Sequence, residues 1–166
     1  MSLRSRVIAA GATGVLALAA TFIGTHEGEV RRVYADIGGV ATYCFGGTER
    51  ITKQTFTAEE CTAQLLQDVQ WARAGVLRAV PNPMPPSVEA AMTSAAYNAG
   101  VGAFARSPMA PLLRAGQWEA ACAALEAPVQ TQHGVARGWR ATVQGRPVRG
   151  LENRRAAEAR LCRQDL

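Results

Sequence analysis

The first 24 residues restrict what this chain can form more than any other segment. Arg4 and Arg6 precede residues 7–24, a run of 18 residues without a charge. As one helix this run would be about 27 Å long, barely enough to cross a ~30 Å hydrocarbon core. Eleven of the 18 residues are Ala, Gly or Thr. The run is therefore a weak membrane span, which can be translocated but is poorly retained.

The two arginines before the run predict that the N-terminus stays in the cytoplasm and the rest of the chain crosses the membrane. Three interpretations remain open: a cleaved signal peptide, a permanent anchor, or an uncleaved segment that holds the protein temporarily. Small residues at Ala17 and Ala19 offer a cleavage site. A cut after Ala19 would leave only seven residues before Glu27, which slightly disfavours cleavage.

The composition predicts one globular domain with a basic surface. The chain has 166 residues, 48% of them hydrophobic and 19% charged, which is enough for a core and typical of folded proteins. The net charge of +5 favours polyanionic partners such as cell-wall polymers or anionic lipid. The arginines are scattered and no nucleic-acid motif accompanies them, so we do not expect nucleic-acid binding.

The four cysteines are candidates for disulfides rather than for metal ligands. None lies in a C-x-x-C pair and the chain has two His, so we expect no metal site. An even number of cysteines in an exported domain indicates disulfides, and three pairings are possible. Four buried thiols are the alternative if the domain stays in a reducing compartment. The cysteines are Cys44, Cys61, Cys122 and Cys162.

Most of the chain after residue 47 has helical patterns. Thr57 and Glu60 form a capping box that opens a long helix over residues 57–80. The Pro-rich residues 81–86 end it, and Ser87 is predicted to cap the next helix, which runs to about Asn98. Further predictions are short helices over 108–115 and 117–126, loops with at most a short helix over 131–150, and a closing helix over 151–162.

These patterns predict an α+β fold that is mostly helical. Residues 38–47, rich in Gly and β-formers, predict a short hairpin or irregular sheet. The long helix could link a small lobe containing this hairpin to a larger helical lobe. A cleft between two lobes is a usual place for an active site.

Three polar residues near the hairpin are candidates for catalysis. Eight residues separate Glu27 from Asp36, and five separate Asp36 from Thr42. Glu27 is predicted to end a helical segment, Asp36 to lie in the turn before the hairpin, and Thr42 to lie on it. Glycoside hydrolysis needs one protonated carboxyl group and one ionised group that can hold a water molecule, with which a hydroxyl can assist. The trio alone is also compatible with an ordinary helix end and an Asp-x-Gly turn.

Longer motifs around these residues resemble one family. The pattern E-G followed by Y-x-D-x-x-G-x-x-T-x-C-F-G resembles the phage-type lysozymes, the muramidases of glycoside hydrolase family 24. Residues 97–107, YNAGVGAFARS, resemble the family's Asn-x-Gly-x-x-x-Phe element, and residues 150–162, GLENRRAAEARLC, resemble its terminal signature. Together the motifs cover nearly all of residues 25–163.

The resemblance implies a two-lobed lysozyme fold and hydrolysis of the β-1,4 bond between N-acetylmuramic acid and N-acetylglucosamine in peptidoglycan, without a cofactor. Glu27 would be the general acid, and Asp36 and Thr42 would orient the attacking water, giving inversion. Asn98 would contact a sugar. Gly47 stands where the family often has a His that is neither acid nor nucleophile. We expect this difference to affect the stability of the small lobe rather than the chemistry.

For the cysteines, pairing within each lobe favours Cys44–Cys61 and Cys122–Cys162. The first segment resembles the signal-anchor-release (SAR) subtype, which implies an anchor over residues 1–25 and a catalytic domain over residues 26–166. Such an enzyme waits inactive in the host inner membrane, held by residues 7–24 with its domain in the periplasm, and is then released. The segment has no cysteine, so we expect activation by refolding rather than by thiol exchange.

Two other functions are also compatible with the sequence. A lytic transglycosylase would cut the same bond without water, and a membrane-tethered wall-binding module would have no catalytic role for Glu27. The Asp36 and Thr42 pair, suited to holding water, favours hydrolysis. We expect the protein to be a monomer.

Overall fold

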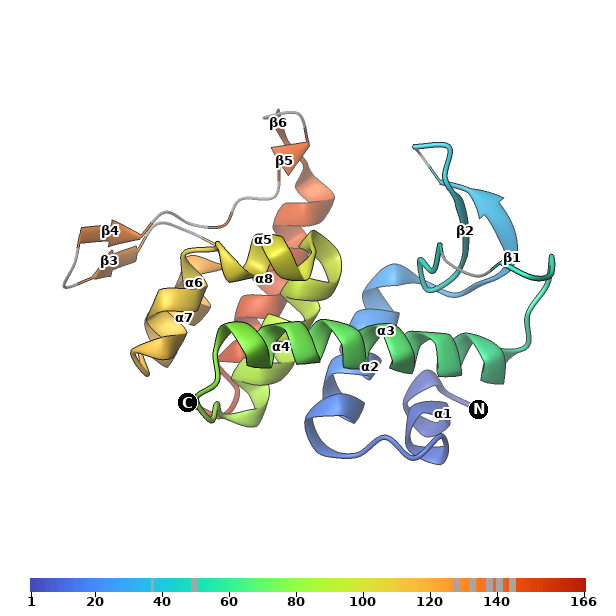
Figure 1. Cartoon of the computed structure of the whole chain (residues 1–166), viewed down its shortest axis with the longest axis horizontal. Helices are drawn as coiled ribbons and strands as arrows, with labels where there is room; N and C mark the ends of the chain where they lie inside the picture. The colour runs from blue at the N-terminus through green and yellow to red at the C-terminus, as the bar shows by residue number, and fades with distance from the viewer. Residues whose placement is uncertain are drawn as a thin grey trace. The chain divides into compact units, whose positions relative to one another are not determined.

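A computed structural model describes residues 1–36, 38–48, 51–126, 129–131, 134–136, 139, 142–143 and 146–166. The chain forms two compact units, residues 1–71 and residues 72–166, and the boundary falls inside helix α3, Ala58–Ala79. The helices and strands of each unit are labelled in Figure 1. The two units are described separately.

The first unit begins with two short helices where the sequence suggested one span. Helix α1, Leu3–Ala9, is followed by α2, Gly14–Glu27. The break has a physical cause, since Gly11 and Gly14 adopt φ values of +87° and +52°, which a continuous right-handed helix does not contain. Within the described residues, no helix has the length and apolar character needed to span a bilayer.

Both N-terminal helices belong to the core of the first unit. Five apolar residues, in these helices or in the segment that links them, are almost completely buried. Gly24 allows close packing, because a Cβ placed there would lie 2.5 Å from Leu3 Cδ2 and 3.0 Å from Leu65 Cδ2. Helices α1, α2 and α3 therefore meet at this glycine. The five buried residues are Val7, Ala12, Ala19, Ala20 and Ile23.

A two-stranded antiparallel sheet follows α2 directly, as Figure 1 shows. Strand β1, Val30–Ala35, pairs with β2, Ala41–Cys44, with Tyr34 opposite Thr42. The hairpin predicted over residues 38–47 begins earlier in the structure, because β1 also belongs to it. Asp36 consequently lies in the turn inside the hairpin and not before it. The adjacent arginines of β1 interrupt the apolar alternation that indicates a strand.

The predicted start of the long helix is confirmed. Thr57 Oγ1 accepts a hydrogen bond from the Glu60 N–H, and Glu60 Oε2 accepts one from the Thr57 N–H. This reciprocal pair fixes the first turn of α3. The Cys44–Cys61 disulfide then joins the end of β2 to that turn, which confirms the first predicted pairing.

The second unit is helical, with α4, Pro86–Ala99, at its centre. Residues 87–96 of α4 are all buried, so this helix is covered on every side. Ser87 does not cap it, contrary to the prediction. The helix starts at Pro86, and the Ser87 hydroxyl donates instead to the Cys162 carbonyl oxygen. The other helices are α5, Val101–Ala105; α6, Met109–Arg114; α7, Trp118–Ala124; and α8, Arg149–Cys162.

The segment between α7 and α8 is not the loop-and-helix region that its Gly and Pro content suggested. It contains two antiparallel strand pairs, β3, Val129–Thr131, with β4, Gly134–Ala136, and β5, Thr142–Val143, with β6, Arg146–Pro147. Such short strands carry too few residues for a periodic signal. The predicted breakers Gly138 and Gly145 lie outside the described residues. The Cys122–Cys162 disulfide joins α7 to α8, which confirms the second predicted pairing.

Candidate active site

Glu27 is the last residue of α2, as predicted, and its side chain is half-buried. Gly28 follows with a φ of +76°, a conformation that glycine adopts without strain, and the chain turns there towards β1. A Cβ placed on Gly46 would lie 3.8 Å from Glu27 Oε2. The carboxyl group of Glu27 therefore faces the turn that follows β2.

Asp36 begins the turn between β1 and β2. Its Oδ1 accepts a hydrogen bond of 2.8 Å from the Val40 N–H, and its own N–H donates to the Val40 carbonyl at 2.9 Å. The Gly39 N–H donates to the Asp36 carbonyl oxygen. The side chain is exposed, so one carboxylate oxygen builds the turn while the group as a whole stays in contact with solvent.

Thr42 lies on β2 and is buried, with 4% of its surface exposed. Its hydroxyl donates a hydrogen bond of 3.0 Å to the Val40 carbonyl oxygen. The backbone of Val40 thus orients both side chains, through its N–H for Asp36 and through its carbonyl oxygen for Thr42. All three residues of the predicted trio belong to the first unit, at the end of α2, in the hairpin turn and on β2.

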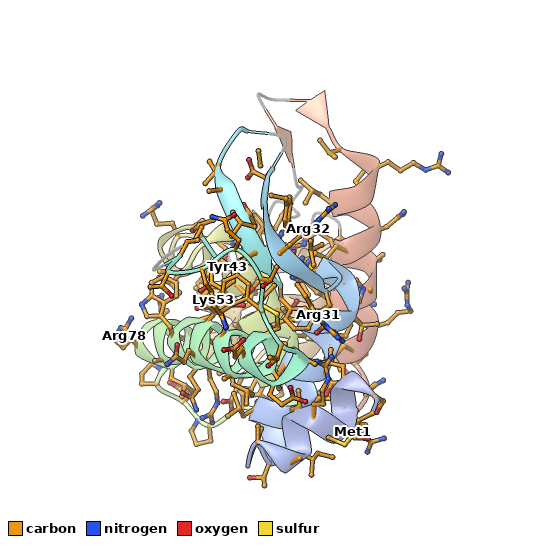
Figure 2. All side chains as sticks on the ribbon, turned by 90° about the vertical axis from the view of Figure 1, so that its right-hand side faces the viewer. Met1, Arg31, Arg32, Tyr43, Lys53 and Arg78 are labelled. Carbon is orange, nitrogen blue, oxygen red and sulfur yellow. A yellow bond between two sulfur atoms is a disulfide. The ribbon has the colours of Figure 1, made fainter. Side chains whose placement is uncertain are left out.

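An ion pair that the sequence analysis missed supports the segment after Glu27. Arg6 of α1 donates two hydrogen bonds to the carboxylate of Glu29, at 2.9 and 2.5 Å, and Arg31 donates a third at 2.8 Å. The hydrogen bond from Arg6 is the main cause that lowers the pKa of Glu29 to about 2, and it also raises the pKa of Arg6. Arg31 stands at the start of β1 in Figure 2.

Asn98, the predicted sugar contact, is near the end of α4 in the second unit, where its side chain is exposed. Arg155 donates a hydrogen bond of 2.8 Å to Asn98 Oδ1. This contact fixes the orientation of the amide and leaves its NH₂ group as the donor end. The structure does not bring Asn98 into the same unit as the trio.

A buried charge cluster holds Arg155 in place. Glu158 is fully buried and lies 2.9 Å from Arg155, and it accepts a hydrogen bond from Ser94 on α4. Burial raises the pKa of the Glu158 carboxyl and lowers that of Arg155. The Arg155 guanidinium also lies 5.3 Å from the centre of the Trp139 ring. Arg155 and Glu158 therefore form an ion pair between residues one turn apart on α8.

Gly47, which departs from the family's pattern, lies where an added side chain would have to displace Gln64 and Tyr43. A Cβ there would lie 2.8 Å from Gln64 Nε2 and 3.0 Å from Tyr43 Cε1. The Gln64 amide in turn donates to Asp68. Gln64 of α3 thus occupies the space beside Gly47 that a side chain at this position would enter.

Potential metal ligands do not cluster in the part of the chain that the structure describes. No group of three or more His, Cys, Asp or Glu side chains there is arranged to hold a metal ion. The side chains available for chemistry at the hairpin are carboxylates and a hydroxyl, which transfer protons and orient water.

Comparisons with known proteins agree with this geometry. The phage lysozyme family matches residues 24–158. A SAR-endolysin from bacteriophage PS119 is 30% identical over 169 residues, covering 97% of this chain and 94% of that protein. A SAR-endolysin from Enterobacteria phage P21 is also 30% identical, covering 97% of this chain and 95% of its own length.

Solved structures share the fold. The active form of the P1 phage endolysin Lyz superposes with a TM-score of 0.80 at 24% identity, covering 98% of this chain and 93% of that one, a likeness that shows the fold alone. A P22 lysozyme variant has a TM-score of 0.71 at 26% identity, covering 86% of this chain and 93% of its own. These matches confirm a mostly helical lysozyme-like fold with a small two-stranded sheet. The chain belongs to the phage lysozyme family and is an endolysin of the SAR type.

Proposed function

We propose that Glu27 is the general acid of a muramidase reaction in which Asp36 and Thr42 orient the attacking water. As a phage-type lysozyme the chain hydrolyses peptidoglycan and so lyses the host cell. The main support for this proposal is the hairpin turn, where hydrogen bonds to Val40 orient Asp36 and Thr42. Glu27 lies at the end of α2, facing the turn after β2.

The different surroundings of the two carboxyl groups support different roles, proton donation for Glu27 and orientation of water for Asp36. Glu27 is half-buried at a helix end, where it can deliver a proton to the leaving oxygen. Asp36 is exposed and its Oδ1 accepts a backbone N–H, and a carboxylate has further acceptor sites with which it can hold a water. A water held between a carboxylate and a hydroxyl attacks from the face opposite the leaving group, which gives inversion.

The products of digestion test this reaction. Purified peptidoglycan is digested with the full chain, and the ends are identified by mass spectrometry, with the anomeric configuration followed by NMR. We expect muramic acid ends that have gained water and the inverted anomer as the first product. Anhydro-muramic ends would establish the alternative, a lytic transglycosylase. Absence of any cleavage would exclude both reactions and leave the wall-binding module as the alternative.

Asn98 is proposed as a sugar contact of the same enzyme. Its Oδ1 accepts from Arg155, which directs the amide NH₂ as a donor, and hydroxyl and acetamido oxygens of a glycan are suitable acceptors. We expect Asn98→Ala to raise KM several-fold and change kcat little. Asn82→Ala, which removes an exposed amide elsewhere in the second unit, is the matched control. An unchanged KM in Asn98→Ala would remove this residue from the site.

For the N-terminus we propose a transient membrane anchor in residues 1–25 and a catalytic domain in residues 26–166. The uncharged run, the preceding arginines and the SAR-endolysin relatives support this division. The enzyme would wait at the host inner membrane with its domain in the periplasm. On release, residues 3–27 would adopt the two packed helices α1 and α2. The released enzyme is proposed to act as a monomer on peptidoglycan, without nucleic acid.

Two glycines allow the anchor to be tested. In a spanning helix Gly11 and Gly14 would be right-handed, whereas here both have positive φ. Alanine favours the helix by about 1 kcal/mol at each position and disfavours the left-handed form by about 1–2 kcal/mol. We therefore expect Gly11→Ala/Gly14→Ala to increase the membrane-bound fraction after cell fractionation. Thr13→Ala, which raises apolarity at an exposed site with φ −133°, is the control. Equal fractions in all three proteins would contradict the anchor.

A further inference from the structure

Arg6 is the one residue of α1 whose charge is buried in the described structure, with 7% of its surface exposed. It makes a two-point ion pair with Glu29, whose side chain is 18% exposed, at 2.9 and 2.5 Å. Its Nη1 also donates a hydrogen bond of 2.8 Å to the Ala58 carbonyl oxygen at the start of α3. One guanidinium thus joins α1 to the β1 entry and to α3, all within the first unit.

The pair lies next to the proposed acid. Glu29 is two residues after Glu27, and only Gly28 stands between them. Gly28 is the position where α2 ends, and a glycine there resists rotation less than any other residue. The backbone on the far side of this pivot is therefore held by the carboxylate of Glu29. Arg31 of β1, labelled in Figure 2, shares that carboxylate.

Arg6 cannot make this contact while residues 7–24, which separate it from Glu29, span a bilayer. Arg6 and Glu29 are 23 residues apart in the sequence. In a continuous helix this distance is about 34 Å along the axis, with Arg6 on the cytoplasmic side and Glu29 on the other. The contact requires the reversal between α1 and α2. A buried Arg6 without Glu29 would be a desolvated, unpaired charge, so the docked form depends on both partners.

We propose that the Arg6–Glu29 ion pair is a latch that forms only when residues 7–24 have left the membrane, and that Arg6 is a positioning residue for Glu27. This inference rests on the proposed role of Glu27 and on the proposed anchor. In the latched form Arg6 fixes Glu29, Glu29 fixes the chain after Gly28, and the carboxyl group of Glu27 is held facing the turn after β2. Without the latch, α1 can detach and the pivot at Gly28 lets the end of α2 move.

The chain contains a matched control for this latch. Arg4 is in the same helix and on the same side of the proposed span, but its side chain is exposed. Arg4→Gln and Arg6→Gln each remove one positive charge before the uncharged run. Both changes should therefore have the same effect on insertion and orientation. Only Arg6→Gln removes the ion pair.

The experiment compares six full-length proteins, purified after release, on purified peptidoglycan. They are the wild type, Arg4→Gln, Arg6→Gln, Glu29→Gln, the double variant Arg6→Gln/Glu29→Gln, and Arg6→Lys. We expect Arg6→Gln and Glu29→Gln each to lower kcat roughly tenfold or more with little change in KM, since small misplacement of a reacting group is costly. The double variant should lose no more than the worse single variant. Arg6→Lys should recover part of kcat, and Arg4→Gln should match the wild type.

A second control separates positioning from general loss of stability. Ser87→Ala removes a buried hydrogen bond to the Cys162 carbonyl in the second unit. It should lower the unfolding midpoint but leave kcat unchanged when assayed well below that midpoint. Hydrogen exchange of residues 3–9 should increase in Arg6→Gln and stay unchanged in Ser87→Ala.

The outcomes distinguish the latch from the function on which it rests. Wild-type kcat in Arg6→Gln, or losses that multiply in the double variant, would overturn the latch while leaving the role of Glu27 intact. Full activity of Glu27→Gln would instead overturn the assignment of the acid. Equal kcat losses in Arg6→Gln and Ser87→Ala at matched stability would reduce Arg6 to a structural residue.

Discussion

Asp36 and Val40 are joined by two hydrogen bonds, one from the Asp36 N–H to the Val40 carbonyl and one from the Val40 N–H to Asp36 Oδ1. The same Val40 carbonyl accepts the hydroxyl of Thr42. The turn that closes the hairpin therefore also positions Asp36 and Thr42, the two side chains proposed to orient the attacking water. The atoms that stabilise the turn are also those proposed to position the water, so each variant must separate an effect on stability from an effect on catalysis.

Asp36→Asn separates charge from turn geometry. The amide oxygen of Asn can still accept the Val40 N–H, so the unfolding midpoint should change little. The negative charge that orients water is lost, and we expect kcat to fall by about 100-fold or more. Asp36→Ala, which loses both, should also destabilise the unit by about 1 kcal/mol. Steady-state turnover and thermal unfolding measure the two effects, and an Asp36→Asn enzyme with normal kcat would exclude Asp36 from catalysis.

Restoring the family's usual residue at Gly47 should harm this protein. In Gly47→His the new side chain meets Gln64 and Tyr43, whose atoms lie within 3.0 Å of the Cβ position. Displacing Gln64 also breaks its hydrogen bond to Asp68. We expect a loss of about 1–3 kcal/mol in the free energy of unfolding, measured in urea. Gly47→His/Gln64→Ala should regain part of the lost stability. An unchanged unfolding midpoint in Gly47→His would show that Gln64 does not restrict the side chain at this position.

The Cys44–Cys61 disulfide ties the hairpin to α3 across a separation of 17 residues. Replacing both cysteines with alanine should lower the free energy of unfolding by about 3 kcal/mol, because the unfolded chain gains freedom. Activity should fall as well, since β2 carries Thr42 and precedes Gly46. The comparison is Cys122→Ala/Cys162→Ala, which should destabilise without altering the hairpin. Equal stability of the Cys44→Ala/Cys61→Ala protein and the wild type would contradict the prediction.

Stability should depend on pH through Glu29. Its pKa is lowered from 4.5 to about 2, chiefly by the hydrogen bond from Arg6. The folded state therefore favours the ionised form. The contribution of the pair is complete above about pH 4.5 and is lost as the pH falls towards 2. After a discount for solvent screening, we expect the pair to contribute about 1–2 kcal/mol to the free energy of unfolding. The stability difference between wild type and Glu29→Gln should shrink over that range, and a difference constant from pH 6 to 2 would contradict it.

Sequence patterns predicted the features that depend on local order. The capping box at Thr57, the Pro stop after residue 80 and the closing helix, predicted over 151–162 and observed over 149–162, all follow from neighbouring residues. The position of Glu27 at a helix end and of Thr42 on a strand was predicted in the same way. Strand β1 was missed because two arginines interrupt its apolar pattern, and this moved Asp36 to the wrong side of the hairpin.

Features that depend on distant contacts were not available from spacing. Arg6 and Glu29 are 23 residues apart, and nothing local links them. The positive φ values of Gly11 and Gly14, which break the uncharged run into two helices, also depend on packing of α1 against α2. These glycines were predicted only to weaken a membrane span, whereas in the folded form they reverse the chain.

The central claim, that Glu27 supplies the proton for cleavage, is tested most directly by the initial rate of peptidoglycan digestion by Glu27→Gln. Glu119→Gln is the control, since Glu119 is an exposed glutamate in the first turn of α7. We predict that Glu27→Gln, with an unchanged unfolding midpoint, releases no muramic acid ends above background while Glu119→Gln matches the wild type. Digestion by Glu27→Gln at the wild-type rate would contradict the account.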